Sequence, residues 1–571
     1  MPPENINLTA EWLIQHVFSF EAGPQRQTVS AELVFEADGR IGGYQHPNEA
    51  AWRIDGGRLV IYRADGTPSC VAIPVEGKDG HVELAGPFLL QQEPQLHFFR
   101  PTALRSDKAT VQTFDLFDTL VTRYCFSPIA IFEAVEAKSR VEGFARLRPE
   151  LEAELWRNGD YTLEDVYARL AAATGWPAGV LERLRIMELA EEWENLFPIR
   201  EMVERVRPGD LIVSDMYLPM SFLRRIVDEK CGLPGLEIHL SNHGKHHGTI
   251  WPKILTSHRI LRHYGDNHFS DVVQARNFGI DAVHVPISEW SAGEAILCSV
   301  GLVEFAKALR KGRLASFSFN KMARRAQLAQ YDANIPLLVV AGLLLIRRAN
   351  EVQADTLLMC GRDSSMWVHL VRWMISLSPR KLAVHYFPSS RELFLADSPA
   401  YAAYFTRLKG DRTIVADVSG TGRTPAQFIA RMAATEDVSV FVALKSSRID
   451  PPMELRAPAR SDVTIDRAID VDLERFLFER FNTAVQEQRA VDMEFLGHDF
   501  RVVREPEEID PATEKLIETI QETFMEALAL LKDAPIMALP ELPSDEELRS
   551  AMQKLVLVGG QYLDVAKQLP N

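Results

Sequence analysis

Cysteine is scarce in this chain and is not arranged in pairs. The 571 residues include five cysteines, an odd number, scattered without the close spacing that is typical of zinc ligands. This pattern argues against a disulfide framework and against a zinc site, and it is typical of proteins in a reducing compartment. The amino terminus also lacks the charged region, apolar stretch and cleavage site of a secretory signal. We therefore expect a cytoplasmic protein.

Long apolar runs and an excess of basic charge are lacking as well. The longest apolar run, Ile335 to Ile346, is shorter than the roughly 20 residues that span a bilayer, so we expect a buried helix and no transmembrane segment. The net charge of −16 disfavours broad binding to nucleic acid or to an anionic membrane surface. A peripheral position at the inner face of the membrane stays compatible with this composition.

The first hundred residues predict an antiparallel β-domain, either a small barrel or a sandwich. Apolar and polar residues alternate there, as in Arg58 to Tyr62, and four Asp-Gly pairs provide hairpin signals. Trp52, Tyr44 and Tyr62 have rings that can stack on sugars. Core packing is the more common role of strand aromatics, and we expect it here.

A short apolar strand that ends in a carboxylate is the most informative feature of the chain. Residues 111–114 favour an extended conformation and lead directly into Asp115-Leu116-Phe117-Asp118-Thr119. A buried parallel strand would place Asp115 at the carboxyl edge of an open sheet, where ligands of α/β folds bind. A carboxylate at that position can attack phosphorus as a nucleophile and help to hold a cation.

Three further motifs follow in order. A second expected strand, 211–213, ends in Ser214, and Lys245 lies in the polar loop Ser-Asn-His-Gly-Lys-His-His-Gly. Farther along, Asp266 and Asp271 belong to the acidic sequence Gly-Asp-Asn-His-Phe-Ser-Asp. Each motif alone is common as a turn or a helix cap, but their shared order and spacing favour one combined site.

Together these motifs resemble the haloacid dehalogenase-like (HAD) superfamily, most of whose members are phosphatases. The resemblance implies that Asp115 is the nucleophile, that Ser214 hydrogen-bonds the transferring phosphoryl group and that Lys245 neutralises charge. It also implies a Mg²⁺ site made by Asp115, the backbone carbonyl of Phe117 and Asp266. Magnesium suits such a site because it prefers a few carboxylate oxygens with phosphate and water.

The chain departs from this family at Phe117. Phosphatases of the superfamily usually carry a second Asp at this position as general acid and base, whereas dehalogenase members carry an aromatic residue there. Asp118 is the nearest replacement for the missing acid, and carbon–halogen displacement is the rival chemistry. Helical periodicity over about 127–207 predicts a cap above the nucleophile, which would exclude water and select the substrate.

A second strand-loop-helix sequence lies at 412–432. Its glycines allow backbone amides to approach an anion, its threonines add hydroxyls, and the start of the following helix favours negative charge. The sequence resembles the phosphoribosyl pyrophosphate loop of type I phosphoribosyltransferases. The resemblance implies that Asp417 contacts the ribose hydroxyls during transfer. It assigns the 5-phosphate to Thr421, Gly422, Arg423 and Thr424, and Ser419 and Gly420 are further substrate-binding candidates of the same loop.

A companion loop lies upstream, after the expected strand 356–360. The resemblance makes it the pyrophosphate-binding loop, which consists of Gly361, Arg362, Asp363, Ser364 and Ser365. The Arg362 guanidinium can bind pyrophosphate oxygens, and Arg391, after the next strand, is a further candidate for the donor site. The family often has two adjacent acids where this chain has Ala416-Asp417. Turn chemistry alone would also explain a Ser-Gly-Thr-Gly sequence.

The expected fold is a multidomain α/β protein, since the length leaves room for roughly three or four domains. We expect an antiparallel β-domain over 1–100 and an HAD-like Rossmannoid domain with a helical cap over 108–295. A phosphoribosyltransferase-like α/β domain is expected over 303–505, followed by a helical carboxyl-terminal segment over 506–571.

This domain order resembles bacterial polysaccharide ribofuranosyltransferases. The resemblance implies transfer of 5-phosphoribose from phosphoribosyl pyrophosphate to a hydroxyl of a glycan acceptor, expected to be lipid-linked. Removal of the 5-phosphate by the HAD-like domain would then give a β-ribofuranosyl residue in a surface polysaccharide such as an O-antigen or capsule. Nucleic acid is not an expected partner, and homo-oligomerisation is left open.

Two rival functions remain at this stage. One is a stand-alone HAD-like phosphatase or dehalogenase acting on small molecules. The other makes the carboxyl-terminal half a non-catalytic module that senses phosphoribosyl pyrophosphate or serves as a scaffold. The first predicts turnover without the donor, and the second predicts donor binding without turnover.

Overall fold

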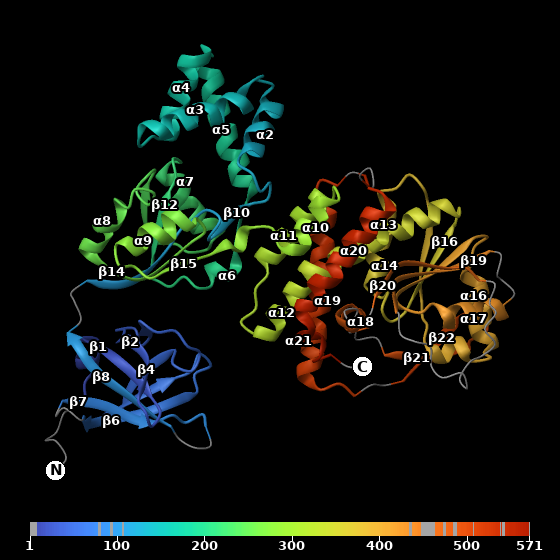
Figure 1. Ribbon diagram of the computed structural model, residues 1–571, viewed down its shortest axis with the longest axis horizontal. Helices are drawn as coiled ribbons and strands as arrows, with labels where there is room; N and C mark the ends of the chain where they lie inside the picture. Colours follow the sequence, from blue (N-terminus) through green and yellow to red (C-terminus); the bar gives the residue numbers. More distant parts are fainter. Residues whose placement is uncertain are drawn as a thin grey trace.

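The computed structural model describes residues 8–77, 81–91, 95–104, 108–432, 437–446, 463–471, 476–483, 488–505, 508–536, 538–539 and 543–569. These residues form a multidomain α/β protein with an antiparallel eight-stranded sheet, two parallel five-stranded sheets and many helices. The antiparallel sheet and the first parallel sheet lie at one end of the molecule, and the second parallel sheet lies at the other (Figure 1).

The amino-terminal sheet closes on itself as a small barrel. Its strands are β1 (His16–Ala22), β2 (Gln27–Phe35), β3 (Ile41–Gly42), β4 (Ala51–Asp55), β5 (Arg58–Tyr62), β6 (Pro68–Glu76), β7 (Val82–Pro87) and β8 (Leu96–Leu104), preceded by helix α1 (Ala10–Ile14). The sheet runs from β3 through β2, β1, β8, β7, β6 and β5 to β4. The two edges meet where the Trp52 amide donates to the Gly39 carbonyl at 2.7 Å.

Aromatic side chains fill this barrel. Phe18, Phe20, Phe35 and Phe99 are at most 1% exposed, and Trp52 is 5% exposed. The Trp52 indole donates to the Glu36 carbonyl at 3.0 Å, which satisfies its polar nitrogen inside the core. The expectation of core packing is therefore confirmed for Trp52.

The first parallel sheet carries the most informative strand of the sequence. Its strands are β9 (Ala109–Phe114), β12 (Leu211–Asp215), β13 (Glu237–Ser241), β14 (His258–Gly265) and β15 (Ala282–His284). The order is β13-β12-β9-β14-β15, so the chain moves outward from β9 in one direction and later in the other. Such a reversal of strand order opens a crevice at the carboxyl ends of the central strands. Asp115 follows β9 at this point.

Helices and short turns connect these strands. They comprise α6 (Arg200–Val203), α7 (Met220–Arg225), η1 (Ile226–Lys230), α8 (Ile250–Ser257), η2 (His268–Val273), α9 (Gln274–Asn277) and η3 (Pro286–Ser288). Apolar residues of the strands, including Phe114 and Ile212, are fully buried beneath them. Burial on both faces is reflected in the continuous apolar run Leu211 to Val213 of β12, whereas β13 and β14 also carry polar residues.

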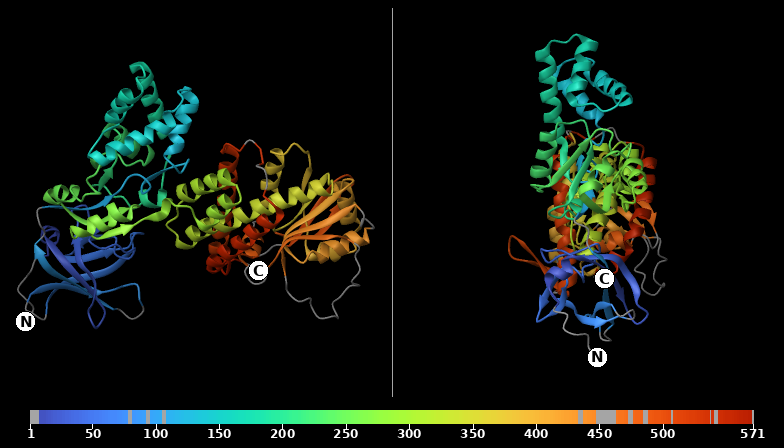
Figure 2. Two further views of the ribbon diagram at one scale, coloured as in Figure 1. Left: turned by 45° about the horizontal axis from the view of Figure 1, so that its top comes forward. Right: turned by 90° about the vertical axis from the view of Figure 1, so that its left-hand side faces the viewer.

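A helical insertion projects from this sheet (Figure 2). It consists of α2 (Ile129–Ser139), α3 (Phe144–Asn158), α4 (Leu163–Thr174) and α5 (Ala178–Asn195), flanked by the antiparallel pair β10 (Val121–Arg123) and β11 (Leu196–Pro198). A capping box at Thr162 begins α4. Inside the insertion, the buried Arg148 guanidinium makes two hydrogen bonds to Glu188, at 3.0 and 2.8 Å.

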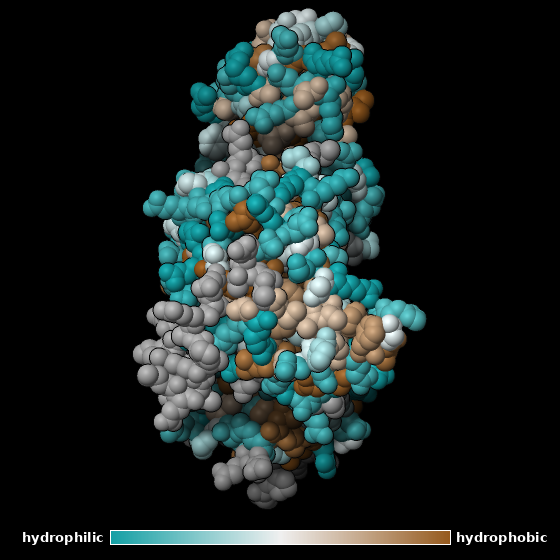
Figure 3. Space-filling model, turned by 90° about the vertical axis from the view of Figure 1, so that its right-hand side faces the viewer, coloured by the Kyte–Doolittle hydropathy of each residue, from teal (hydrophilic) through white to brown (hydrophobic). Residues whose placement is uncertain are grey.

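The second parallel sheet has a different strand order. Its strands are β16 (Thr356–Cys360), β17 (Ala383–Phe387), β18 (Thr413–Gly420), β19 (Val438–Ser446) and β20 (Ile465–Val471). The order β17-β16-β18-β19-β20 places the reversal between β16 and β18. Associated elements are α14 (Trp367–Ser376), α15 (Arg391–Leu395), α16 (Pro399–Leu408), α17 (Arg423–Arg431), α18 (Phe476–Thr483) and the hairpin β21 (Arg489–Phe495) and β22 (Phe500–Glu505). Hydrophilic residues cover most of the face of this end seen in Figure 3, with smaller hydrophobic patches between them.

A helical core lies between the two parallel sheets (Figure 1). It contains α10 (Ala292–Ser299), α11 (Val303–Ala315), α12 (Lys321–Ala329), η4 (Gln330–Asn334), α13 (Ile335–Glu351), α19 (Pro511–Asp533), α20 (Asp545–Gly559), η7 (Gly560–Tyr562) and α21 (Leu563–Ala566). Residues from α13, α19, α20 and the second sheet share one hydrophobic core. The helices after residue 510 therefore pack into the same core as the second sheet.

Helix α13 confirms the expected buried helix at Ile335 to Ile346, where every residue is buried. The continuous helical stretch Lys321–Glu351 is long and apolar enough to cross a membrane by length and composition. Its most apolar window is nevertheless wholly buried inside the protein. The core helix of a folded domain has the same properties.

Candidate active sites at the two parallel sheets

Asp115 lies at the carboxyl end of β9, where the strand order reverses. Its amide donates to the Tyr264 carbonyl of β14 at 2.8 Å, which continues the pairing of the two strands beyond the end of β9. The residue is 6% exposed. A carboxylate in such an environment needs a nearby cation or hydrogen-bond donors.

Lys245 supplies that cation. Its ammonium contacts Asp115 at 2.5 Å and Asp271 at 2.6 Å, and the lysine itself is 3% exposed. Asp271 is held further by His263 Nε2 at 3.2 Å and by the Asn267 amide at 3.0 Å. The structure thus brings together the nucleophile candidate, the lysine and the second acid of the downstream motif.

The pKa values of this cluster are strongly shifted. Burial, together with Asp271 and Asp266, raises the pKa of Asp115 well above its ordinary value, although Lys245 opposes the shift. Burial also raises the pKa of Asp266 to about 6. Burial would raise the pKa of Asp271 as well, but Lys245 and His263 outweigh it and lower that pKa. Strongly perturbed acids beside one cation are typical of functional sites.

Three carboxylates of the cluster could hold a metal ion. One oxygen each of Asp115, Asp266 and Asp271 lie within 4.8 Å of one another. Hard carboxylate oxygens around a partly open position suit Mg²⁺, which keeps several waters and binds phosphate. Asp115 and Asp266 were expected as ligands, and Asp271 joins them. The carbonyl of Phe117 stays a predicted ligand.

Ser214 and Asp215 end β12 beside this cluster. Ser214 is 2% exposed, at the strand end where a phosphoryl-binding hydroxyl is expected. Asp215 accepts hydrogen bonds from the Lys245 amide at 2.9 Å and from the His246 amide at 3.0 Å. It therefore orients the loop that carries Lys245. Sequence analysis did not assign this role, because a carboxylate that binds backbone amides leaves no motif.

Asp118 lies in a tight turn, three residues after Asp115. Its φ is +57°, and its carboxylate accepts a hydrogen bond from the Thr122 hydroxyl at 2.6 Å. Thr122 in turn accepts from Arg310 of α11 at 2.8 Å. Burial lowers the pKa of Arg310 to about 10. The proposed replacement acid is thus held by a chain of contacts that begins outside the first sheet.

The helical insertion contacts the loop that carries Lys245. His243 Nδ1 lies 3.1 Å from the Asp160 carboxylate, and the Asn242 side chain donates to the Tyr161 carbonyl at 2.5 Å. The ring of Trp156 lies 5.2 Å from His243 and 5.4 Å from His246. Residues around α3 and α4 therefore border the site, as a cap would.

Two polar loops meet at the strand reversal of the second sheet. The Ser419 hydroxyl, after Asp417 in β18, donates to the Asp363 carboxylate at 3.3 Å. The Ser389 hydroxyl donates to the Gly361 carbonyl at 2.9 Å. The loops that follow β16 and β17 and the carboxyl end of β18 are therefore joined at one edge of the sheet.

Glycine is required at two positions of these loops. A Cβ on Gly361 would lie 2.1 Å from the Tyr386 hydroxyl. Gly422 begins α17 with φ of +71°, and a Cβ there would lie 2.8 Å from Ile465 and 3.1 Å from Val442. The close approach of backbone to neighbouring strands explains both glycines before any ligand is considered.

The remaining donor-site candidates lie at the same edge. The Ser364 and Ser365 hydroxyls are buried and have no hydrogen-bond partner among the residues that the structure describes. Such groups usually have a partner, so a ligand or water is expected there. Asp417, Ser419, Gly420, Thr421, Arg423 and Thr424 are partly exposed, as are Arg362 and Asp363. Arg391 begins α15 and is exposed.

Cys360 is a member of this edge that sequence analysis did not place there. It is 1% exposed at the end of β16. Burial raises the pKa of its thiol well above the ordinary value, and the charges of Asp417 and Asp363 add to the shift. The thiol therefore stays protonated, and the two acids lie close enough to influence it.

No protein-family model matches the sequence, and a search of curated proteins finds no match. The fold and the site geometry define the class of the molecule as a multidomain α/β protein. Each of its two parallel sheets carries interacting polar loops where the strand order reverses.

Proposed function

We propose that this chain transfers 5-phosphoribose from phosphoribosyl pyrophosphate to a glycan hydroxyl and then removes the 5-phosphate. The product would be a β-ribofuranosyl residue in a bacterial surface polysaccharide. The observation that carries the proposal is the pairing of polar loops at both strand reversals. Lys245 contacts Asp115 at 2.5 Å at one, and Ser419 contacts Asp363 at 3.3 Å at the other.

The first step takes place at the second sheet. The bond between the ribose anomeric carbon and pyrophosphate breaks, and a bond from the acceptor oxygen to that carbon forms on the opposite face. The acceptor hydroxyl releases its proton, and pyrophosphate leaves with the bonding electron pair. Asp417 steadies the ribose through its hydroxyls while positive charge develops on the ring. The loop from Ser419 to Thr424 holds the 5-phosphate.

The second step takes place at Asp115. Its carboxylate attacks phosphorus, the bond between phosphorus and the ribose oxygen breaks, and that oxygen takes up a proton. Water then releases phosphate from the aspartyl-phosphate and restores the carboxylate. Lys245 orients Asp115 and balances charge, and Asp118 is the nearest candidate to supply the proton. Mg²⁺ held by Asp115 and Asp266, with Asp271 beside them, would neutralise the phosphoryl oxygens.

The test separates the two steps by their products. The protein is incubated with phosphoribosyl pyrophosphate, Mg²⁺ and a glycan acceptor, while pyrophosphate and phosphate are measured independently. We expect Asp417→Asn to stop release of both. Asp115→Asn should stop phosphate release alone, and mass spectrometry should then find the acceptor increased by one phosphoribosyl group.

A matched control is Asp533→Asn, which changes an exposed carboxylate at the end of α19 and should affect neither product. Phosphate release that survives Asp115→Asn would contradict the division of labour. Turnover of small phosphate esters or haloacids without the donor would favour the stand-alone enzyme. Donor binding without pyrophosphate release would favour the sensing module.

A further inference from the structure

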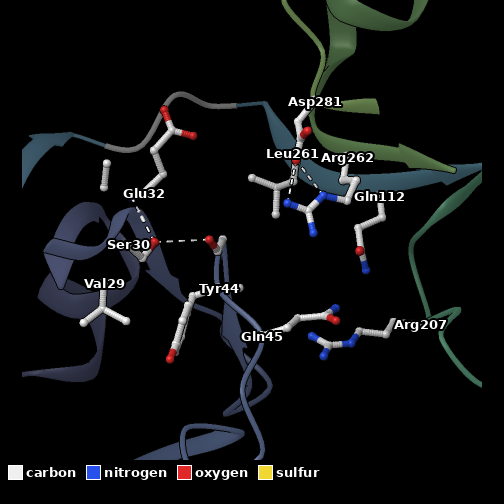
Figure 4. A pocket seen from close by; sticks show the side chains of 13 residues that line it. Val29, Ser30, Glu32, Tyr44, Gln45, Gln112, Arg207, Leu261, Arg262 and Asp281 are labelled. Atoms are coloured by element: carbon white, nitrogen blue, oxygen red, sulfur yellow. Dashed lines mark hydrogen bonds and ion pairs between the residues drawn. The ribbon is translucent and has the colours of Figure 1, made fainter. Parts of the chain in front are cut away.

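A polar cavity of about 500 Å³ lies between the amino-terminal barrel and the first parallel sheet. Figure 4 shows its two walls, one from the barrel strands β2 and β3 and the other from the sheet. On the sheet side it is bordered by Arg207, which precedes β12, and by Asp281, which precedes β15. These are the amino ends of the strands, whereas Asp115 follows the carboxyl end of β9. The cavity is therefore separate from the proposed phosphatase site.

The acidic side chains of the cavity are already paired. Asp281 forms an ion pair with Arg262 at 2.5 Å, and Glu32 forms one with Arg259 of β14 at 2.6 Å. The second pair also links the barrel to the sheet. Negative charge in the lining is thus neutralised by the protein itself.

Several hydrogen-bond donors of the cavity remain unused. The Gln112 side chain is 8% exposed, and its oxygen accepts from Tyr264 at 3.3 Å, while its NH₂ group bonds to no described residue. The Arg207 guanidinium and the Gln45 amide likewise form no hydrogen bond or ion pair with the part of the chain that the structure describes. In Figure 4, Gln45 and Arg207 extend toward each other from opposite walls, with Gln112 above them.

We infer that this cavity binds a small ligand carrying an oxyanion, either a phosphate or a carboxylate. A guanidinium offers five N–H donors and each amide offers two, so the unused groups form a donor-rich site. The charge of Arg207 interacts with the buried Asp210 carboxylate, but that carboxylate is hydrogen-bonded to the backbone amides of Gln112 and Arg207, which leaves the guanidinium donors for a ligand. An oxyanion is the chemical partner that such a site requires, since charge-assisted hydrogen bonds are the strongest available to it. The volume accommodates hydroxyl-bearing groups around the anion.

Two kinds of ligand could supply the oxyanion. One is an acidic sugar of a glycan, and the other is phosphate or pyrophosphate, the products of the proposed reaction. In both cases the ligand connects Gln45 of the barrel with Arg207 and Gln112 of the sheet. This gives the barrel a role as one wall of a binding site. The inference rests on the cavity alone and does not require the proposed reaction.

Calorimetric titration of the full chain with phosphate, pyrophosphate, glucuronate and glucose tests the inference. We expect an oxyanion to bind and glucose not to bind. Arg207→Ala should weaken that binding by about tenfold or more, because it removes the charged donors that face the cavity. Gln45→Ala should weaken it by a smaller factor. Preference for glucuronate would identify an acidic sugar as the source, and preference for phosphate or pyrophosphate would identify the reaction products.

The matched control is Arg205→Ala, which changes an exposed arginine two residues away that pairs with Glu201 at 3.4 Å. The Arg205→Ala variant should bind the oxyanion with the same affinity as the unmodified chain. This comparison also separates the cavity from the Asp115 cluster, where phosphate can bind in every variant. Equal binding by Arg207→Ala and Arg205→Ala would overturn the inference, as would the absence of binding by every oxyanion. Neither result bears on the products of Asp115→Asn and Asp417→Asn.

Discussion

At the scale of single residues, the buried ammonium of Lys245 holds two carboxylates that would otherwise repel each other. It contacts Asp115 and Asp271, and all three groups are at most 6% exposed. Removal of one partner from a buried ion pair leaves an uncompensated charge, which is far more costly than the loss of a surface pair. The lysine is therefore expected to matter for folding as well as for chemistry.

The first prediction concerns this lysine. Lys245→Met should lower the free energy of unfolding by about 3–5 kcal/mol, because it leaves two buried carboxylates without a cation. Urea denaturation provides the measurement, with the exposed Lys253→Met as control. Addition of Asp271→Asn should recover part of the loss, since it removes one of the unpaired charges. Equal stability of the two lysine variants would contradict the ion-pair geometry.

The second prediction concerns a histidine in the barrel. His97 is 5% exposed, stacks on Phe88 at 4.6 Å, and has a pKa that burial lowers to about 4. In the unfolded chain the pKa of this histidine is about 6.5. Above pH 6.5 the ring is therefore neutral in both states, and its burial costs the barrel no stability. Stability is lost as the pH falls from 6.5 to 4, by about 2 to 3 kcal/mol.

Hydrogen exchange of the barrel amides, corrected for the intrinsic effect of pH, provides the measurement. His97→Phe keeps an aromatic ring between Phe88 and Phe20 and removes the titrating group, so the loss of protection between pH 6.5 and 4 should become smaller. His81→Phe, at an exposed position, serves as control and should retain the full loss. If both variants lost the same protection between pH 6.5 and 4, His97 could not be the cause of that loss.

At the scale of elements, the junction of β18 and α17 depends on one backbone conformation. Gly422 has φ of +71° and lies against side chains of β19 and β20. This close packing allows the start of α17 to lie at the edge where the loops of Ser419 and Asp363 meet. The helix start and the loop are therefore positioned by the same residue.

The third prediction follows from this packing. Gly422→Ala should lower the free energy of unfolding by about 2–3 kcal/mol, from the cost of a left-handed residue and from overpacking against Ile465 and Val442. Gly179→Ala, in α5 with open space around it, should leave stability unchanged or raise it by about 0.5 kcal/mol. Urea denaturation compares the two. A neutral effect of Gly422→Ala would mean that the junction relaxes without strain.

The elements that sequence alone predicts are those with local signals. Alternation and Asp-Gly pairs predict the barrel strands, the apolar run before Asp115 predicts β9, and helical periodicity predicts the insertion between β10 and β11. Convergence of Asp115, Lys245 and Asp266 could be expected because parallel strands share one carboxyl edge. The chemical roles of these residues stay predictions.

Long-range contacts explain what sequence did not predict. The Thr113 hydroxyl lies 2.9 Å from His263 Nδ1 only because β14 pairs with β9, and Asp215 orients Lys245 only because two strand ends meet. Arg310 reaches Thr122 across 188 positions of the sequence. Such contacts depend on how elements pack, and neither residue type nor periodicity reveals them. The polar cavity beside the barrel likewise depends on how the barrel packs against the first parallel sheet, so the sequence does not reveal it.

At the scale of the whole molecule, α11 connects the helical core to the loop of the proposed nucleophile. Arg310 is 1% exposed and donates to the Ser288 carbonyl, the Arg123 carbonyl and the Thr122 hydroxyl at 2.7, 2.9 and 2.8 Å. Thr122 holds Asp118. A planar guanidinium can reach three acceptors in fixed directions, which a lysine ammonium cannot reproduce.

The fourth prediction uses this difference. Arg310→Lys should reduce phosphate release about tenfold while pyrophosphate release stays unchanged, because only the loop of Asp115 and Asp118 loses its support. Arg325→Lys, at a half-buried arginine of α12 that pairs with Asp564 far from Thr122, should change neither rate. The ratio of the two products is the measurement. An equal fall in both products would point to a general loss of folded protein.

The sharing of one core by α13, α19 and α20 has a consequence for biosynthesis. The apolar surface of α13 leaves the ribosome before its partners exist, since α20 ends about 200 residues later. At about 5–20 residues per second, this interval lasts roughly 10–40 s. During that time the apolar surface of α13 is exposed to solvent. We expect the nascent chain to need a chaperone until α19 and α20 have been translated.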